Sequence, residues 1–379
     1  MSLEAQLAAA ENQLESTADS LGDLLEQIGD RISPALLGDR HRQTLFERAR
    51  AIPSTVAAFP FGFEFPLHDS EPKADLGISL VGGTRSAAYF ERRGQAKNAG
   101  GFEVGLAWLL DDTHSEGAFI RRLTGRKMML EYDIGSAPAG DIQDPGLFLR
   151  SARQPLSGGE RQAREVAAML DAVVKAVGWK PEPGEHQHIA RVHGALEEDA
   201  RVESLGAFPA RTRRIRLAVS GLRNIENTLS FLARTGGPVH CAASTIGPFE
   251  ARQAFVDLSV HFDVHPHGLG PTLGLGFAAK ERIANDPRYW IDPPQQWNPF
   301  LCCLRESQLG VPDKLSALET WPSKPELLIC QGGTLILIRG IHHVKFLLRN
   351  HRVEAIKAYV FFLLCPWPIG SAGAARRRH

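Results

Sequence analysis

A two-residue alternation of apolar and polar side chains is the feature that most restricts how this chain can fold. In residues 256–264 (VDLSVHFDV) every second side chain is apolar, and Asp, Ser or His stands between them. Successive side chains of a β-strand point to opposite faces, so this segment predicts a strand with one apolar and one polar face. Residues 127–134, 214–219 and 353–363 follow the same pattern. Several strands of the chain are therefore expected to be amphipathic.

Helical patterns separate these strands, and the connections within strand pairs are short. Short connections indicate antiparallel pairing. A doubly wound nucleotide-binding fold is not expected, because the chain lacks the βαβ pattern with a Gly-rich first turn that marks such folds. Amphipathic strands form either a sheet with one face in water or a closed barrel whose polar faces line a lumen. Tyr359 and Met129 among the polar-face residues favour the barrel. We predict an α+β fold in which antiparallel strand pairs alternate with helices and close into a ββ/αα barrel with the helices outside.

The expected elements follow from periodicity and turn residues. Helices are predicted at residues 3–29, 34–50, 158–177, 222–234, 297–306 and 312–319. Strands are predicted at residues 76–81, 87–91, 127–134, 214–219, 254–265, 271–277, 341–349 and 353–363. Gly82 and Gly83 predict a hairpin between the first two of these strands. Residues 59–66, rich in Phe and Pro, are expected to form an extended connector.

The length of 379 residues suits one large domain or two of moderate size. We expect a helical region at residues 1–58 and a barrel-like domain at residues 59–368. The small and basic residues 369–379 are expected to be a disordered tail.

Charge and cysteine content restrict the partners and the compartment. Lys+Arg and Asp+Glu both number 43, so no overall positive field attracts nucleic acid or anionic lipid. The five cysteines show no CxxC spacing, which is typical of reduced thiols. Neither a signal peptide nor a membrane span is recognisable. We expect a cytoplasmic protein that binds neither nucleic acid nor a membrane.

Residues 155–162 (PLSGGERQ) look like the signature loop of an ABC ATPase. That loop works only with a P-loop, and the chain contains no GxxxxGK[ST] motif. Ser157 is therefore expected to be a helix N-cap, with Glu160 three residues later completing a capping box.

His261, Asp263 and His265 alternate along one predicted strand and share its polar face. Such a set suits zinc or non-haem iron, so a metal-dependent enzyme is one alternative for the function. Pro266 and Gly268 are expected to end the strand near His265. Polar residues at a strand end are the competing interpretation, and we predict no metal site.

Basic residues stand on the polar faces of several different strands. If the barrel closes, these side chains can converge on an anion such as a diphosphate, with Arg as a bidentate fork and Lys as a point charge. If it stays open, they are solvent-exposed cations. The candidate residues are Lys127, Arg214, Arg216, Lys345 and Lys357.

Two short motifs resemble those of the ABBA-type aromatic prenyltransferases, particularly the bacterial indole prenyltransferases. Residues 73–83 (KADLGISLVGG), followed by residues 87–91 (AAYFE), are similar to the first strand pair of that family. Lys357-Ala-Tyr359 matches its Lys-x-Tyr motif, and Arg214-Ile-Arg216 is a weaker match. The chain departs from the family in having Asp75 in place of Glu, Ala87 in place of a basic residue, and one intact Lys-x-Tyr.

The resemblance implies transfer of an allyl group from a prenyl diphosphate to an aromatic or peptide side-chain acceptor, in secondary metabolism. It implies that Asp75 accepts a proton from the acceptor and that Tyr359 shields the allyl cation. The basic residues named above would bind the diphosphate. No cofactor is required, and Mg²⁺ is optional. The other alternative is a non-enzymatic accessory or recognition protein of a biosynthetic pathway.

Overall fold

The computed structural model describes residues 3–111, 115–125, 127–134, 143–151, 156, 160–197, 199–280, 290–293, 295–331 and 333–366. Its eleven strands form one antiparallel sheet in the order β11-β1-β2-β3-β4-β5-β6-β7-β8-β10-β9. Pairing of β10 with β11 closes ten of them into a barrel and leaves β9 outside the ring. The strands are β1 (Phe61–Pro66), β2 (Asp75–Val81), β3 (Lys127–Tyr132), β4 (Gly146–Arg150), β5 (Arg201–Ala207), β6 (Ile215–Ser220), β7 (Asp257–His265), β8 (Gly268–Ala278), β9 (Glu326–Cys330), β10 (Gly333–Arg349) and β11 (Arg352–Pro366).

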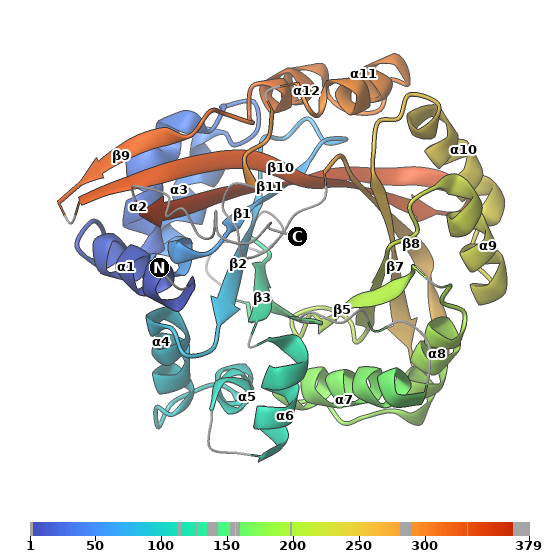
Figure 1. Ribbon diagram of the computed structural model, residues 1–379, viewed down its shortest axis with the longest axis horizontal. Helices are drawn as coiled ribbons and strands as arrows, with labels where there is room; N and C mark the ends of the chain where they lie inside the picture. The colour runs from blue at the N-terminus through green and yellow to red at the C-terminus, as the bar shows by residue number, and fades with distance from the viewer. Residues whose placement is uncertain are drawn as a thin grey trace, which may run out of the picture.

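Helices surround the ring of strands on its outer side (Figure 1). They are α1 (Leu3–Glu15), α2 (Leu21–Ile28), α3 (Asp39–Ala49), α4 (Arg85–Gly94), α5 (Gly101–Leu110), α6 (Ser115–Thr124), α7 (Glu160–Ala176), α8 (Pro183–Gly194), α9 (Ile225–Thr235), α10 (Val239–Glu250), α11 (Asn298–Glu306) and α12 (Pro312–Glu319). Short 3-10 helices lie at η1 (Gly29–Arg31) and η2 (Ser54–Ala58). None of the described helices is long and apolar enough to cross a bilayer.

The hydrophobic core lies between the strands and the helices. Phe277 on β8 and Phe346 on β10 contact Phe249 of α10 and Phe300 of α11, with ring centroids 5.3–6.3 Å apart. The apolar strand faces are therefore turned outward to the helices, and the polar faces are turned inward. This arrangement confirms the predicted α+β barrel with outer helices.

The predicted hairpin around Gly82 and Gly83 is wrong, because residues 85–94 form helix α4. The hydroxyl of Thr84 accepts the N–H of Ala87 at 3.2 Å and caps this helix. Ala87 and Phe90, three residues apart, are both buried. A spacing of three residues places both side chains on one helix face, and this packing outweighs the turn signal of the two glycines.

Two further predictions need correction. Residues 61–66 form the barrel strand β1 rather than a connector, with Phe61, Phe63 and Phe65 buried. Residues 3–29 form two helices, since α1 ends at Glu15 and Ser20 begins α2 with a capping box. The capping interaction predicted at Ser157 and the tail at residues 369–379 lie outside the described residues.

Candidate functional site

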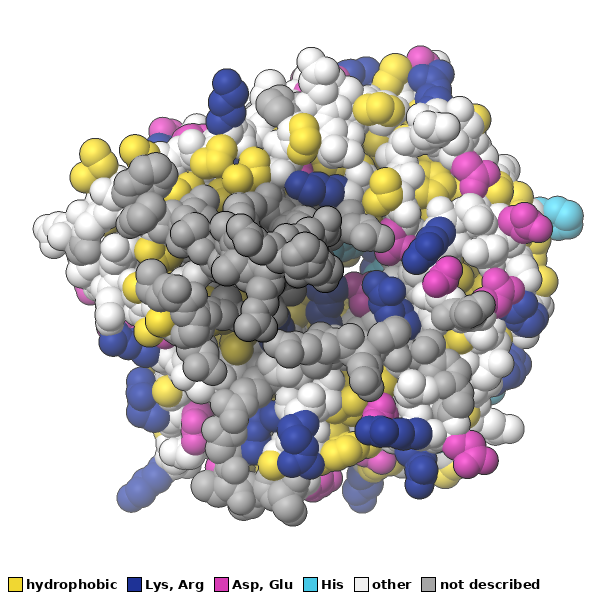
Figure 2. Space-filling view, in the orientation of Figure 1, with side chains coloured by type: hydrophobic (Ala, Val, Ile, Leu, Met, Phe, Trp, Pro, Cys, Tyr) yellow, Lys and Arg dark blue, Asp and Glu magenta, His cyan; other side chains and the backbone are white. Residues whose placement is uncertain are grey.

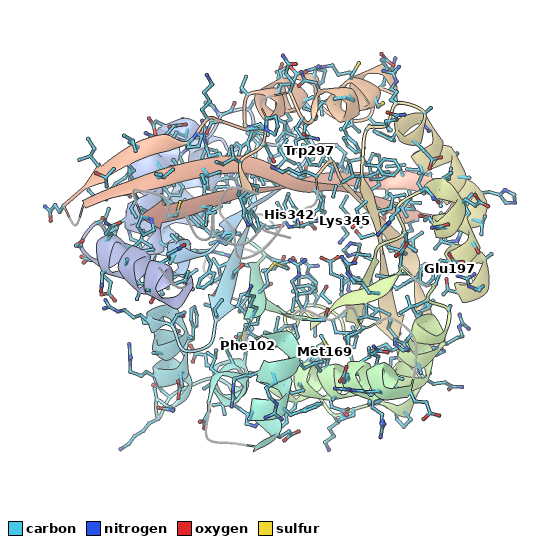
Figure 3. The ribbon with its side chains drawn as sticks, in the orientation of Figure 1. Phe102, Met169, Glu197, Trp297, His342 and Lys345 are labelled. Atoms are coloured by element: carbon cyan, nitrogen blue, oxygen red, sulfur yellow. The ribbon has the colours of Figure 1, made fainter. Side chains whose placement is uncertain are left out.

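The strand register brings polar side chains from several strands into the barrel lumen. Residues directly opposite one another in an antiparallel pair share a face of the sheet. Tyr359 on β11 is opposite both His343 on β10 and Glu64 on β1, and Lys357 is opposite Lys345. These five side chains therefore lie on the inner face. Figure 3 shows Lys345 inside the ring of strands.

The lumen has an acidic and a basic side. Glu64 lies opposite Asp75, and Glu131 lies opposite Gly77, so three neighbouring strands present carboxylates inward. We call Glu64, Asp75 and Glu131 the acidic wall, and Arg216, Lys345 and Lys357 the basic wall. The space-filling view down the barrel shows Lys and Arg side chains beside acidic ones, set back at the centre of this face (Figure 2).

Part of the described lumen surface is accessible to solvent. Glu131, His261, His343 and Tyr359 each keep part of their surface accessible although they point into the barrel. Two inward-facing glycines of β8 make room for the side chains of neighbouring strands. A Cβ atom on Gly274 would lie 2.8 Å from Cε of Lys345, and one on Gly276 would lie 2.3 Å from the hydroxyl oxygen of Ser259.

Lys345 is the most unusual group of the basic wall. Its side chain is only 5% exposed. Among the described residues no carboxylate forms an ion pair with its ammonium, which lies 5.8 Å from the ring centre of Tyr359. Burial and the nearby positive charge of Arg216 lower the pKa of Lys345 to about 7. A buried cation in this state is well suited to receive an anion.

Glu64 and Lys357 form an ion pair on the inner face. Burial of Glu64 opposes ionisation, but the charge and hydrogen bond of Lys357 outweigh it and lower the pKa of Glu64 to about 2. Lys357 itself has a raised pKa: burial opposes its charge, and Glu64 outweighs burial. Lys357 is therefore a charged but already neutralised member of the basic wall.

Glu131 has the opposite electrostatic environment. Burial and the negative charge of Glu64 raise the pKa of Glu131 to about 7, although Lys345 and Arg216 partly counteract this. Two carboxylates on one wall thus have pKa values displaced in opposite directions. Such a separation is typical of sites where one carboxylate stays ionised and the other exchanges a proton.

Aromatic rings adjoin the basic wall. The rings of Tyr359 and His343 are stacked, with centroids 4.1 Å apart and planes 10° apart. His343 also shares a 2.8 Å hydrogen bond between Nδ1 atoms with His342. Burial and the charges of Lys345 and Arg216 hold the pKa of His261 well below its usual value, so this imidazole is neutral.

Arg214 and Arg216 share one acidic partner. Asp263, 4% exposed, accepts hydrogen bonds from Nε of Arg216 at 2.6 Å and from a terminal nitrogen of Arg214 at 3.3 Å. Nε of Arg214 is buried and finds no hydrogen-bond partner in the described part of the chain. One carboxylate thus offsets two guanidinium charges, which leaves positive charge on this side of the lumen.

Asp75 and Lys127, two further predicted site residues, both face inward. Asp75 lies opposite Glu64 and accepts the backbone N–H of Ile134 at 2.9 Å. Lys127 begins β3, four residues before Glu131, which places it roughly 13 Å along the strand at the usual rise per residue. The structure thus groups Asp75 with the acidic wall and sets Lys127 apart from the basic wall.

The three residues of the metal alternative do not converge. Asp263 forms ion pairs with Arg214 and Arg216. His261 forms a hydrogen bond with Ser259 at 3.1 Å, and Nδ1 of His265 forms one with the carbonyl oxygen of Arg213 at 3.2 Å. No group of three or more His, Cys, Asp or Glu residues able to hold a metal ion occurs within the described ranges. A metal centre at His261, Asp263 and His265 is therefore not formed.

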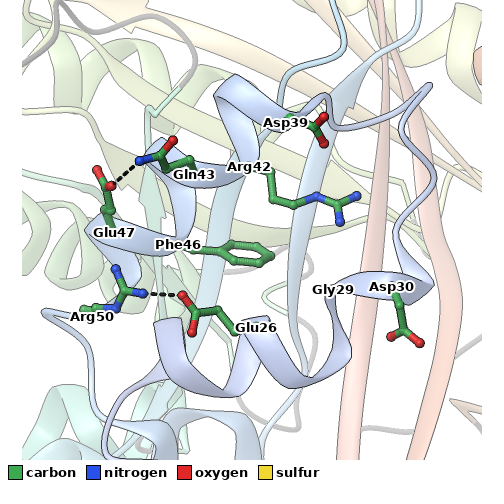
Figure 4. A pocket seen from close by; sticks show the side chains of 9 residues that line it. All are labelled: Glu26, Gly29, Asp30, Asp39, Arg42, Gln43, Phe46, Glu47 and Arg50. Atoms are coloured by element: carbon green, nitrogen blue, oxygen red, sulfur yellow. Dashed lines mark hydrogen bonds and ion pairs between the residues drawn. The ribbon is translucent and has the colours of Figure 1, made fainter.

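A pocket of about 430 Å³ lies outside the barrel, between α2 and α3 (Figure 4). Several of its polar groups already have partners within the chain. Arg50 forms ion pairs with Glu26 and Asp23, and Gln43 donates to Glu47 at 2.8 Å. The lumen, in contrast, holds a buried Lys without an acidic partner among the described residues. We therefore place the candidate site in the lumen.

Several site residues escaped the sequence analysis. Glu131 stands on the polar face of a predicted strand, yet nothing in its local sequence marks it out from other acidic residues. Glu64 lies in the Phe- and Pro-rich segment interpreted as a connector, although Phe61, Phe63 and Phe65 alternate around it. His343 lies two residues before Lys345 on the same face of β10, but nothing in its local sequence marks it as a site residue.

No protein-family model matches the sequence, and no curated protein matches it. The structure, in contrast, matches solved structures of ABBA-type aromatic prenyltransferases. NotF, crystallised with brevianamide F and DMSPP, is 12% identical with a TM-score of 0.50, and the match covers 93% of this chain and 94% of NotF. At this identity the likeness shows a shared fold. The resemblance seen in the sequence is thus confirmed for the fold.

Two further similar structures cover nearly the whole chain. AnaPT from Neosartorya fischeri is 11% identical over 93% of each chain, with a TM-score of 0.48. The 6-dimethylallyltryptophan synthase from Micromonospora olivasterospora, in complex with DMASPP and Trp, is 12% identical over 94% of this chain and 97% of its own, with a TM-score of 0.45.

Proposed function

We propose that this protein is an aromatic or peptide-side-chain prenyltransferase of secondary metabolism. It would move an allyl group from a prenyl diphosphate to an electron-rich acceptor inside the barrel. The observation that carries the proposal is Lys345, buried in the lumen beside Arg216 without a carboxylate partner in the described part of the chain. A diphosphate would supply the missing negative charge.

The basic wall would stabilise the diphosphate leaving group. As the C–O bond of the prenyl diphosphate breaks, its electron pair leaves with the diphosphate, and negative charge grows on the bridging oxygen. Lys345 and the forks of Arg214 and Arg216 would stabilise that charge in a site partly closed to water. These cations act without a metal, so the proposal needs no cofactor, and Mg²⁺ bound to the diphosphate is optional.

The stacked rings of Tyr359 and His343 provide for the other product of this step, the allyl cation. An aromatic face attracts a cation through its quadrupole, and the attraction is strongest where water is excluded. Tyr359 stays a neutral phenol, because burial and the charges of Glu64 and Glu131 raise its pKa well above the usual value. The pair would shield the cation from water until the acceptor attacks.

The acidic wall would remove the proton that the acceptor must lose. Attack by the acceptor forms a bond to the allyl carbon, and the acceptor must then lose a proton. Asp75 is the base expected from the resemblance, and Glu131 is a second candidate because its pKa of about 7 suits a proton acceptor near neutral pH. Glu131 interacts electrostatically with Lys345 and Arg216, the cations that would hold the diphosphate.

The structure of NotF with brevianamide F and DMSPP supports this proposal by analogy. That protein binds both compounds within the same fold. Because fold alone does not determine function, the lumen residues of this chain carry the proposal.

The proposal is tested by incubating the purified protein with dimethylallyl diphosphate and a panel of indoles, phenols and peptides. Mass spectrometry should detect an acceptor that has gained one dimethylallyl group, with release of one diphosphate per transfer. Geranyl diphosphate, tested in parallel, reports on the prenyl length.

The rival function is a non-enzymatic accessory or recognition protein that uses the lumen as a docking groove. It predicts no mass gain with any acceptor and no diphosphate-dependent rise in melting temperature. That pair of results would reject the prenyltransferase and favour the rival.

A further inference from the structure

Strand β9 is the open edge of an otherwise closed sheet. Among the described strands it pairs only with β10, on one side, and its other side has no neighbour. Figure 1 shows β9 running along the outside of β10, away from the ring. A strand edge of this kind presents unpaired backbone N–H and C=O groups that readily pair with another strand.

The side chains of β9 make this edge unusually apolar. Leu327 is 59% exposed and Ile329 is 85% exposed, and alternation places both on the same face. Leu328, between them, is partly buried against the main core on the other face. Exposed apolar side chains on a free edge predict association unless charges or proline protect the edge.

The protection that β9 has is confined to its beginning. Pro325 precedes the strand, and Glu326 is its only charged residue. Glu326 forms ion pairs with Arg31 and with Arg339, so its charge is neutralised within its own chain. The residues from Leu327 to Cys330 carry no charge that would repel an approaching strand.

We propose that β9 is a homodimer interface in which two copies of this chain pair antiparallel along their β9 edges. With a two-fold axis at Leu328, residue 327 of one copy lies opposite residue 329 of the other, and residue 326 opposite residue 330. The apolar pair Leu327 and Ile329 then meets its own counterpart on one face. No like charges come opposite one another, because Glu326 faces Cys330.

The choice of a second copy as the partner follows from this self-complementarity. An isologous interface uses the same patch twice, and a strand that is apolar at 327 and 329 satisfies that condition around residue 328. On the face of Leu327 and Ile329, the pairing would extend a row of apolar side chains that begins at the buried Ile336 of β10, opposite Leu327. The two barrels would then share a continuous sheet across β10 and β9 of each copy.

A five-residue edge buries little surface, so the dimer should be weak and dependent on concentration. Sedimentation velocity of the full chain should show a monomer–dimer equilibrium across the micromolar range. The variant Ile329→Lys places a charge at the centre of the apolar cluster and should lower the association constant at least about tenfold, equivalent to about 1.4 kcal/mol. Val256→Lys, at another exposed apolar residue (49% exposed), is the matched control and should associate like the natural chain.

A cysteine variant tests the register. Leu328→Cys brings two thiols opposite each other at the axis. Directly opposed Cβ atoms of paired strands approach to about 4.5 Å, the upper limit for a disulfide, so mild oxidation should cross-link the two copies. Val104→Cys, on the exposed side of α5, should not cross-link. A monomer throughout the micromolar range, unchanged association of Ile329→Lys, or equal cross-linking of the two cysteine variants would overturn the proposal.

The proposal is independent of the function proposed for the lumen. Leu327 and Ile329 belong to neither wall of the candidate site. Ile329→Lys should therefore keep whatever transfer activity the natural chain has.

Discussion

Lys345 illustrates how a single residue can be unfavourable for stability and favourable for binding. Its ammonium is buried, and the charge of Arg216 lies near it. Holding such a group in the folded state costs free energy unless an anion is bound. Charged groups that destabilise the free protein are a common feature of functional sites.

Replacing Lys345 by Met should therefore stabilise the free protein. The pKa of Lys345 in the folded state, about 7, lies below the ordinary value of 10.5, so the folded protein disfavours the protonated form. The destabilisation is complete below pH 7 and disappears as the pH rises through 10.5. Urea unfolding should show the variant more stable by about 1–4 kcal/mol near neutral pH, with a smaller difference at alkaline pH.

Lys357→Met is the matched comparison for Lys345→Met. Lys357 is paired with Glu64, so its removal leaves a buried carboxylate without its partner and should destabilise the protein by about 3–5 kcal/mol. Equal effects of the two substitutions would contradict the assignment of Lys345 as the unpaired cation.

The pH dependence of prenyl transfer should report Glu131. As a base it must be ionised, so kcat/KM should fall as the pH drops below about 7, where Glu131 becomes protonated. Glu131→Gln should lower kcat by about 10²–10⁴-fold and abolish this acidic limb. If Glu131→Gln keeps the limb and Asp75→Asn abolishes activity, Asp75 is the base instead.

At the scale of single residues, sequence reasoning found most of the basic side and little of the acidic side. Lys and Arg on an otherwise apolar strand are conspicuous, which is how Arg214, Arg216 and Lys357 were selected. The significance of Glu131 depends on Glu64 two strands away in the sheet. An interaction between residues 64 and 131 has no local signal.

Among the elements, β8 contributes to the site because two of its inward-facing residues are glycines without side chains. Gly274 lies opposite His261 on β7 and Leu347 on β10, and Gly276 lies opposite Ser259 and Lys345. A Cβ at Gly274 would come within 3.0 Å of Cβ of His261 and closer still to the end of Lys345. These glycines therefore let the long side chains of the neighbouring strands lie across β8.

Gly274→Val should displace Lys345 and weaken diphosphate binding about tenfold, or about 1.4 kcal/mol, while the fold remains intact. Gly77→Ala is the control, because a Cβ at this inward-facing glycine meets only one backbone atom, at 4.0 Å. Calorimetric titration with inorganic diphosphate measures the affinity of each variant. Equal affinities of the two variants would show that β8 does not position Lys345.

The elements also show where local patterns fail. The strands with clean alternation, β3, β6, β7 and β11, were predicted because their two faces differ. β1 was misread because its proline and phenylalanines mask the same alternation, and residues 85–94 were misread because two glycines suggested a turn. The short strands β4 and β5 were not predicted, since four of the five residues of β4 and three of the seven of β5 are apolar or Gly in unbroken runs.

For the whole molecule, barrel closure is what converts scattered charges into one site. β1 and β11 are nearly 300 residues apart along the chain, yet Glu64 and Lys357 meet because these strands pair. Alternation predicted that polar faces exist, but it could not establish which residues share a lumen. The pairings of β10 with β11 and of β11 with β1 complete the ring and bring the basic wall to the acidic wall.

The central claim is that the lumen holds a prenyl diphosphate on Lys345. The most direct measurement is calorimetric titration of dimethylallyl S-thiolodiphosphate into the natural chain and into Lys345→Met. We predict one molecule bound per chain, with affinity at least about tenfold weaker in the variant, corresponding to about 1.4 kcal/mol. No binding to the natural chain, or equal affinity for both proteins, would contradict the claim.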